Sequence, residues 1–231
     1  MWPNFTCMID LEPFWITLKL AVITTAILFF IAVPLAYWLS NSKNKSKTIM
    51  EVIVSMPLVL PPSVIGFYLL LAFSPSQSFG KFLQDHFDIR LVFSFPGLVI
   101  ASLIYSLPFM VHPIQSGFAS LSPTLREASF SLGKNKWQTL TKVLLPNIKS
   151  SILSGIVLTF AHTIGEFGVV LMIGGNIPGE TKVASIAIYD EVESMNYDNA
   201  NIYAAILFVT TFIILLSVYL VNHRLEKIRG L

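Results

Sequence analysis

The sequence predicts an all-α, polytopic membrane protein with five transmembrane helices, or six at most, in one domain that covers residues 1–231. Of the 231 residues, 54% are hydrophobic and 12% are charged, whereas soluble domains carry about 25% charged residues. The mean hydropathy is +0.71. Several uncharged stretches reach the roughly 20 residues that a helix needs to cross a bilayer, and one long polar insertion, residues 119–149, separates them. These observations exclude a soluble globular domain.

Five apolar segments are long enough to be spans, because a helix rises about 1.5 Å per residue and the hydrocarbon core is about 30 Å thick. The first is uncharged from Leu20 to Leu39. Asp10 and Glu12 precede it without any basic residue, which predicts a retained first span and no cleaved signal peptide. The predicted spans are residues 15–39, 52–73, 91–111, 150–173 and 202–221.

Two of these spans contain residues that are unusual at membrane depth. The second span is interrupted by Pro57, Pro61 and Pro62, which cannot donate backbone hydrogen bonds. We therefore expect it to face protein or a wet cavity, with a simple proline kink as the alternative. The fourth span contains His162 and Glu166, which are four residues apart and so are expected on one helical face. Ionisable groups at this depth are candidates for function.

The polar insertion is predicted to form two short helices that meet at a glycine. Ser122 is a good N-cap, Pro123 suits the first helical turn, and Gly133 provides a C-terminal stop. The second helix begins near Asn135 and runs into Pro146. Each helix has an apolar stripe, formed by Leu125, Ala128, Ser129 and Leu132 in the first and by Trp137, Leu140 and Leu144 in the second. A plain solvated loop is the alternative interpretation.

A turn-rich stretch, residues 174–181, separates the fourth and fifth spans. Pro178 and Gly179 suit the two central positions of a type II turn, and Thr181 is predicted to cap the short helix that follows. That helix is too apolar for open water, yet acidic residues end it too early for a crossing. We expect residues 181–193 to lie at the interface or to re-enter the membrane, with a sixth crossing as the alternative.

The distribution of basic residues predicts which side of the membrane each loop occupies. Residues 40–51, 119–149 and 222–231 hold 11 of the 15 lysines and arginines. The positive-inside rule assigns such segments to the cytoplasm. The chain is therefore expected to be a multi-pass protein of the cell membrane, surrounded by lipid, with its N-terminus outside and its C-terminus in the cytoplasm.

Several functional classes lack the residues that they need. Cys7 is the single cysteine, so no intrachain disulfide can form, and no Cys/His cluster has metal-ligand spacing. We expect no metal, no cofactor and no nucleic-acid partner. The sequence has no G-x-x-x-x-G-K-S/T phosphate loop, so the chain is not itself an ATPase and is expected not to be an enzyme.

The polar insertion also matches a known motif. Glu127 and Ala128 are followed by Gly133 and later by the segment from Val143 to Pro146. This arrangement resembles the cytoplasmic coupling loop of ABC-importer permeases, E-A-A-x-x-x-G-x(9)-I-x-L-P, with Ser129 at the second alanine and Val143 at the isoleucine. The resemblance implies a loop that docks into a groove of a separate ATPase subunit. The coupling residues that it implies are Glu127, Ala128, Gly133, Leu145 and Pro146.

Three further stretches, PLVLPP at 57–62, GEFG at 165–168 and NIPGET at 176–181, together resemble the molybdate permease of ABC importers. The resemblance implies an ABC-importer permease fold with cytoplasmic coupling helices, and transport of molybdate or tungstate by alternating access. It also implies a homodimer on two ATPase copies, fed by an extracytoplasmic molybdate-binding protein. The implied candidates for the translocation path or outer gate are Pro61, Pro62, Gly165, Glu166, Gly168, Pro178, Gly179, Glu180 and Thr181.

Other functions remain open at the level of sequence. Sulfate permeases share the Gly-Glu-Phe-Gly element, so a sulfate or thiosulfate permease is the nearest alternative, and the Pro-Gly-Glu-Thr turn favours molybdate by resemblance. A secondary transporter would use Glu166 and His162 as a proton relay. An intramembrane enzyme would need more than these two groups. Hydroxyl groups that could donate to an oxyanion are those of Ser102, Ser106, Ser154, Thr159 and Thr163.

Overall fold

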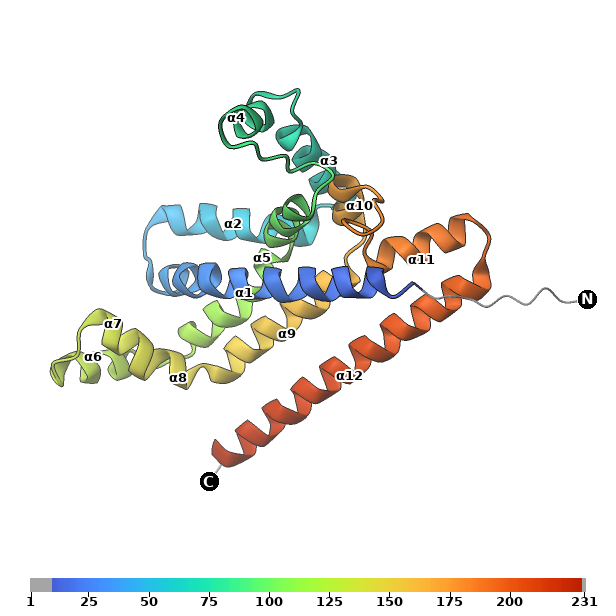
Figure 1. Ribbon diagram of the computed structural model, residues 1–231. Coiled ribbons are helices and arrows are strands. Elements are labelled where there is room, and N and C mark those ends of the chain that lie inside the picture. The colour runs from blue at the N-terminus through green and yellow to red at the C-terminus, as the bar shows by residue number, and fades with distance from the viewer. Residues whose placement is uncertain (1–9, 230–231) are drawn as a thin grey trace, which may run out of the picture.

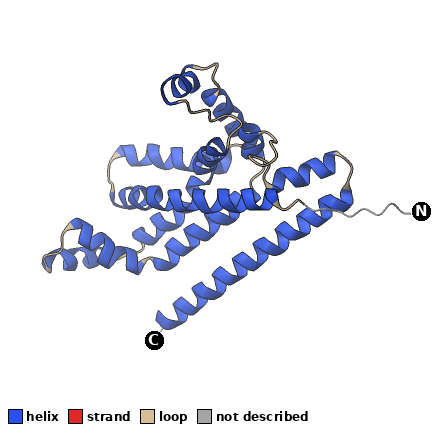
Figure 2. Cartoon of the chain, viewed as in Figure 1, coloured by secondary structure: helices blue, strands red, loops and turns tan. Residues whose placement is uncertain are grey.

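The computed structural model describes residues 10–229, and over this range the regular secondary structure is entirely helical (Figures 1 and 2). The short helix α7 continues directly into a π-helical segment, η1. The elements are α1 Glu12–Asn41, α2 Lys45–Val59, α3 Pro62–Phe73, α4 Ser78–Phe87, α5 Phe95–Ala119, α6 Pro123–Ser131, α7 Lys136–Thr139, η1 Leu140–Leu144, α8 Leu145–Asn147, α9 Lys149–Gly165, α10 Gly168–Gly174, α11 Ala184–Glu193 and α12 Tyr197–Arg229.

Within the described range, three helices are long and apolar enough to cross a membrane: α1, α5, and α12 over Tyr197–Leu220. Two bent helix pairs also qualify if each is counted as one span. The first pair is Lys45–Val59 and Pro62–Phe73, with a bend of 113° between the two helices. The second pair is Lys136–Asn147 and Lys149–Gly165, with a bend of 76°. The count is then five, and the predicted all-helical, polytopic fold is confirmed.

The second predicted span, 52–73, differs from a continuous helix. It is α2 and α3, separated at Leu60, whose ψ of 136° is extended. A residue that precedes a proline rarely adopts the helical conformation, and Pro61 and Pro62 have no backbone N–H to donate to the preceding turn. Helix α2 therefore ends here, and α3 starts with Pro62 in its first turn. Helix α2 also begins earlier than predicted, inside the basic loop.

The fourth predicted span, 150–173, is likewise divided. Helix α9 ends at Gly165, Glu166 is extended with a ψ of 133°, and α10 begins at Gly168. Glycine is the weakest helix former after proline, so Gly165 and Gly168 lower the free-energy cost of interrupting the helix at Glu166. His162 and Glu166 therefore do not share a helical face, which corrects the expectation from their spacing.

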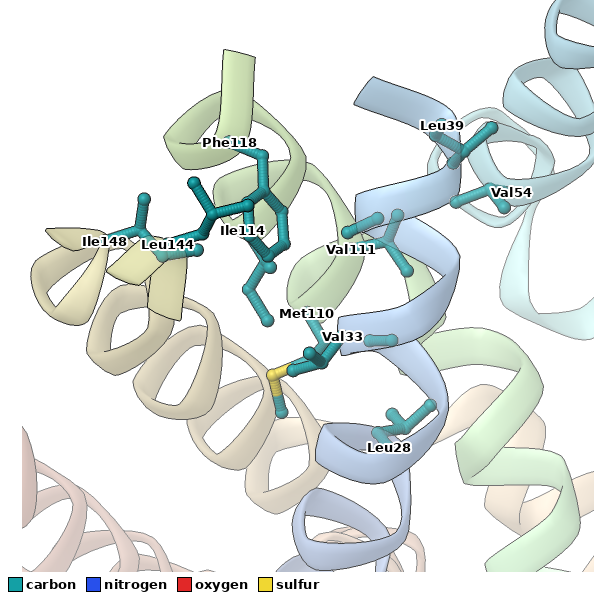
Figure 3. Packing of buried hydrophobic residues seen from close by; sticks show 12 residues of the cluster. Leu28, Val33, Leu39, Val54, Met110, Val111, Ile114, Phe118, Leu144 and Ile148 are labelled. Atoms are coloured by element: carbon teal, nitrogen blue, oxygen red, sulfur yellow. The ribbon is translucent and has the colours of Figure 1, made fainter. Parts of the chain in front are cut away.

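The core of the bundle lies where α1, α5 and α9 pack together. Figure 3 shows one hydrophobic cluster of this core, to which α1 contributes Leu28, Val33 and Leu39 and α5 contributes Met110 and Ile114. Small residues allow the close approach, as in many membrane helix pairs. At Gly117, for example, a Cβ would lie 2.6 Å from the side chain of Ser151 in α9.

Two spans contribute little to this core. Helix α2 buries only Val54 and Pro57, and Val59 is 82% exposed. Within one chain, the expected contact of the second span with protein comes mainly from α3, which packs on α10. The described side chains of α12 are also largely exposed, and Figure 1 shows this helix diverging from the bundle. The reason is that both helices place apolar residues on most of their faces, which suits contact with lipid or with another subunit.

Candidate coupling and translocation sites

The polar insertion folds as the predicted helix-turn-helix, at the opposite end of the molecule from α10 and α11 (Figure 1). Ser122 Oγ accepts a hydrogen bond from the backbone N–H of Thr124 at 3.3 Å, and Pro123 occupies the first turn of α6. The chain reverses at Gly133, whose φ is +75°. This left-handed conformation is disfavoured for residues with a Cβ, which explains the glycine.

The second half of the insertion starts with a capping box. Asn135 Oδ1 accepts from the backbone N–H of Gln138 at 2.8 Å, and Gln138 Oε1 accepts from the backbone N–H of Asn135 at 3.2 Å. The two halves are joined by the buried hydroxyls of Ser129 and Thr139, which lie 2.9 Å apart. The serine at position 129, where the family motif has alanine, therefore has a structural role, because its hydroxyl links α6 to α7.

Leu145 and Pro146 follow a π-helical turn. The backbone N–H of Leu145 donates to the carbonyl of Leu140, five residues back, which is the π-helical pattern. The wider turn lets Pro146, which has no N–H, continue into α8 without occupying a regular donor position. The chain bends at Ile148, and α9 begins. Leu145 and Pro146 therefore shape the joint between the insertion and α9.

The insertion presents a surface that its own chain does not cover. Glu127, Ala128 and Gly133 are exposed, and a Cβ at Gly133 would meet no atom within 4 Å. Leu132 is 79% exposed and Trp137 is 71% exposed, although both belong to the predicted apolar stripes. We refer to these five residues as the docking surface. Large apolar side chains held in water beside a glycine turn are typical of a protein interface.

The two interrupted spans touch each other at their breaks. A Cβ at Gly168 would lie 2.7 Å from Cβ of Pro62, so the start of α10 packs directly on the start of α3. Pro61 and Gly165 are exposed beside this contact. Broken helices at membrane depth expose backbone groups and recur at the substrate sites of transporters. This crossing places Pro62 beside Gly168, and Pro61, Gly165 and Glu166 adjoin these two residues along the chain. Their part in a translocation path or outer gate stays a prediction.

Glu166 has a defined structural role in the crossing. Glu166 is 7% exposed, and its Oε1 accepts a hydrogen bond from the backbone N–H of Val169 at 2.8 Å. This bond caps α10. The carbonyl of Glu166 accepts from Ser185 Oγ at 2.7 Å, which ties α11 to the break. His162 instead contacts α5, where its Nδ1 lies 3.0 Å from Ser106 Oγ and its ring stacks on Phe109. The structure records no direct bond between His162 and Glu166 in the described range.

The candidate hydroxyls lie mostly inside the bundle. Ser106 and Thr163 are 3.2 Å apart, and Thr163 donates to the carbonyl of Thr159 at 2.9 Å. Ser102, Ser106, Thr159 and Thr163 are all at most 2% exposed, whereas Ser154 is half-buried. These four side chains are therefore packing groups of α5 and α9 in this chain, as is common for hydroxyls in membrane helices.

The Pro178–Gly179 turn forms as predicted. Gly179 has a φ of +78°, which the third position of a type II turn requires, and the backbone N–H of Glu180 donates to the carbonyl of Ile177 at 3.2 Å. Pro178, Gly179 and Glu180 are exposed. Thr181 is fully buried, and its Oγ1 donates to the carbonyl of Gly174 at 2.7 Å. Thr181 therefore braces the loop from within.

Helix α11 is capped by a residue that the sequence did not suggest. Thr181 was expected to cap it, but Val183 is at the N-cap position, and Thr17 Oγ1 of α1 accepts from the backbone N–H of Ala184 at 2.8 Å. With 10 residues, α11 is about 15 Å long and cannot cross the membrane. Asn176 and Lys182 both bind Asp190, with Lys182 Nζ 2.6 Å from its carboxylate. The segment is thus held against the bundle as a short packed helix.

Five candidate spans, two of them broken and packed together at their breaks, are the architecture of a transport permease. The exposed helix-turn-helix at one end is its candidate docking site for another subunit. More specifically, the chain belongs to the family described as "Binding-protein-dependent transport system inner membrane component", which matches residues 31–228. It is therefore the permease component of an ABC transporter, a multi-pass inner-membrane protein that works in a complex with a periplasmic binding protein and an ATPase.

Comparisons with individual proteins agree with this assignment. The chain is 40% identical over 210 residues to the "Molybdenum transport system permease protein ModB" of Azotobacter vinelandii, covering 91% of this chain and 93% of the relative. It is 30% identical to the "Sulfate transport system permease protein CysT" of Escherichia coli K12, covering 84% and 69%. A bacterial alginate ABC transporter, solved in complex with an alginate pentasaccharide-bound periplasmic protein, matches with a TM-score of 0.79 and 20% identity over 96% of this chain and 81% of that one. The predicted resemblance to ABC-importer permeases is confirmed, and the secondary-transporter alternative is excluded, since the family draws its energy from an ATPase.

Proposed function

We propose that this chain is the permease of an importer for molybdate or tungstate. The observation that carries the choice of substrate is the difference between the relatives, because identity is 40% over 91% of the chain for a molybdenum permease and 30% over 84% for a sulfate permease. Molybdate, tungstate and sulfate are all tetrahedral dianions. The family alone therefore does not choose among them.

The proposed mechanism is alternating access. ATP closes a pair of ATPase subunits, their grooves draw two copies of the docking surface together, and the attached spans open outward to receive the anion from a molybdate-binding protein. Two copies of this chain and two of the ATPase make up the assembly. The exposed apolar face of α2, which includes Val52 and Val59, gives a second copy a surface on which to pack.

Electrostatics is consistent with an anion as substrate. A dianion at membrane depth is repelled by fixed negative charge. Glu166 is the acidic residue of the fourth predicted span, and its carboxylate is turned onto the backbone N–H of Val169. Its negative charge is therefore partly offset by the amino end of α10.

The substrate can be tested by reconstitution. We expect proteoliposomes that contain this permease and its ATPase, supplied with the binding protein, to accumulate radiolabelled molybdate when ATP is present on the ATPase side. Unlabelled tungstate should compete strongly and unlabelled sulfate weakly. Vesicles with the permease but without the ATPase are the matched control and should show no uptake.

A sulfate permease is the second candidate, and the 30% identity to a sulfate permease favours it. The same experiment separates the two. Sulfate that competes as well as tungstate, or labelled sulfate that accumulates faster than molybdate, would contradict the proposed substrate while leaving the importer intact.

From the positive-inside rule we propose that the docking surface lies in the cytoplasm. In a Cys7→Ser background, single cysteines at Ser46 and Lys134 should react with a membrane-impermeant maleimide only after the cells are permeabilised. A cysteine at the exposed Glu180 is the matched control and should react in intact cells. Labelling of positions 46 and 134 in intact cells would reverse the proposed orientation.

A further inference from the structure

Arg126 is the residue of α6 that reaches across to α1. Its Nη2 donates a hydrogen bond to Asn41 Oδ1, and its guanidinium carbon lies 5.9 Å from the centroid of the Tyr37 ring. Asn41 is itself fastened to the last turn of α1, because its Nδ2 donates to the carbonyl of Tyr37 at 2.7 Å. The end of α1 and the middle of α6 are therefore joined through one side chain.

This contact spans a space that other side chains leave open. A cavity of about 420 Å³ lies between the end of α1, the end of α5 and the start of α6. Asn41 and Lys43 line it from α1 and the residues after it, Phe118 from α5, and Arg126 from α6. The main packing partners of α6 are instead η1 and α7. A movement of α6 relative to the bundle is thus opposed here by the polar contact of Arg126 and by little apolar packing.

Arg126 and Glu127 both line this cavity but differ in exposure. Successive residues of a helix point about 100° apart. Glu127 is exposed on the docking surface, whereas Arg126 is half-buried against α1. One turn of α6 therefore carries both a residue open to another subunit and a residue bonded to the membrane bundle.

We propose that Arg126 is a positioning residue that transmits movement of α6 to α1 through Asn41 and Tyr37. Helix α1 packs along α5 and α9, so a displacement of its end acts on the whole core. Arginine suits this role because its planar guanidinium can bond to an amide and stack on a tyrosine at the same time, which lysine does poorly. The inference rests on the proposed docking of the ATPase at the insertion, but it concerns the contact of α6 with α1.

The test measures coupling and assembly separately. Arg126→Met keeps the aliphatic stem and removes the guanidinium, and Asn41→Ala breaks the same contact from α1, away from the docking surface. In proteoliposomes with the ATPase and the binding protein, both variants should retain the ATPase but lose about fivefold or more in anion taken up per ATP hydrolysed, within the usual range of coupling between sites. Lys43→Met, which removes a positive charge from an exposed residue of the same cavity, is the matched control and should behave like the unaltered chain.

The outcomes separate this inference from the proposed function. A normal ratio of uptake to hydrolysis in Asn41→Ala, with the ATPase bound, would overturn the role of Arg126 and leave the importer standing. Failure of the unaltered chain to retain the ATPase would contradict both. If Arg126→Met does not assemble, Asn41→Ala decides. Asn41→Asp gives the guanidinium a carboxylate partner and should keep the ratio that Asn41→Ala lowers, and a ratio that falls equally in both variants would contradict the role of this contact.

Discussion

Gly133→Val is expected to separate the permease from its ATPase and to abolish ATP-driven uptake. Gly133 has a φ of +75°, and a β-branched residue in this conformation costs about 1–2 kcal/mol or more. A Cβ would meet nothing within 4 Å inside the chain, so the harm comes from the distorted turn and from bulk presented to the partner. Since 1–2 kcal/mol is a factor of about 5–30 in an equilibrium constant, retention of the ATPase should fall by about that factor. Co-purification of the ATPase and uptake in proteoliposomes measure the effect.

Two further substitutions divide the causes. Asparagine tolerates positive φ, so Gly133→Asn should keep the thermal stability of the permease and still weaken ATPase binding through added bulk. Lys134→Val is the neighbouring control, because its backbone is not in the left-handed region, and it should do less harm. Glu127→Ala removes an exposed carboxylate and should weaken the ATPase contact without changing thermal stability. Normal assembly and coupling in both Gly133→Val and Glu127→Ala would refute the assignment of the docking surface.

Glu166→Leu is expected to destabilise the permease and to abolish uptake, whereas Glu166→Gln should preserve most of both. Leucine cannot accept the hydrogen bond from the N–H of Val169, a fully buried residue, and an unsatisfied buried donor costs about 1–3 kcal/mol. Glutamine keeps an acceptor oxygen at the same reach. Thermal unfolding in detergent and uptake in proteoliposomes measure the two effects.

The pair of variants distinguishes a cap from a titrating group. A proton carrier must ionise, so glutamine would disable it as thoroughly as leucine does. A Glu166→Gln permease that is as stable as the unaltered chain but does not transport would contradict the capping role. His162→Gln is a useful companion because His162 contacts Ser106 and Phe109, not Glu166, and its effect should be independent of that at Glu166.

Several features of the coupling loop could be predicted from the sequence because their causes are local. Ser122 and Asn135 can satisfy free N–H groups within three residues of themselves, so their positions predict where helices begin. Gly133 is needed wherever a φ near +75° reverses the chain. The apolar stripes were predicted correctly as patterns, but Leu132 and Trp137 do not pack on their own chain. A pattern shows that a face is apolar and does not show which molecule covers it.

Short stretches of this chain specify a helical membrane permease with a helix-turn-helix insertion. They do so through their hydropathy, their prolines and glycines, their charge asymmetry and their helix caps. Contacts between distant segments specify the rest. The packing of Gly168 on Pro62 joins residues more than a hundred positions apart, and the cap of α11 comes from Thr17, 167 residues away from Ala184. The tie between Arg126 and Asn41 is of the same kind. Such pairs depend on how α1, α5 and α9 pack, and the free energy of that packing is shared among many side chains, so no local pattern identifies the partners.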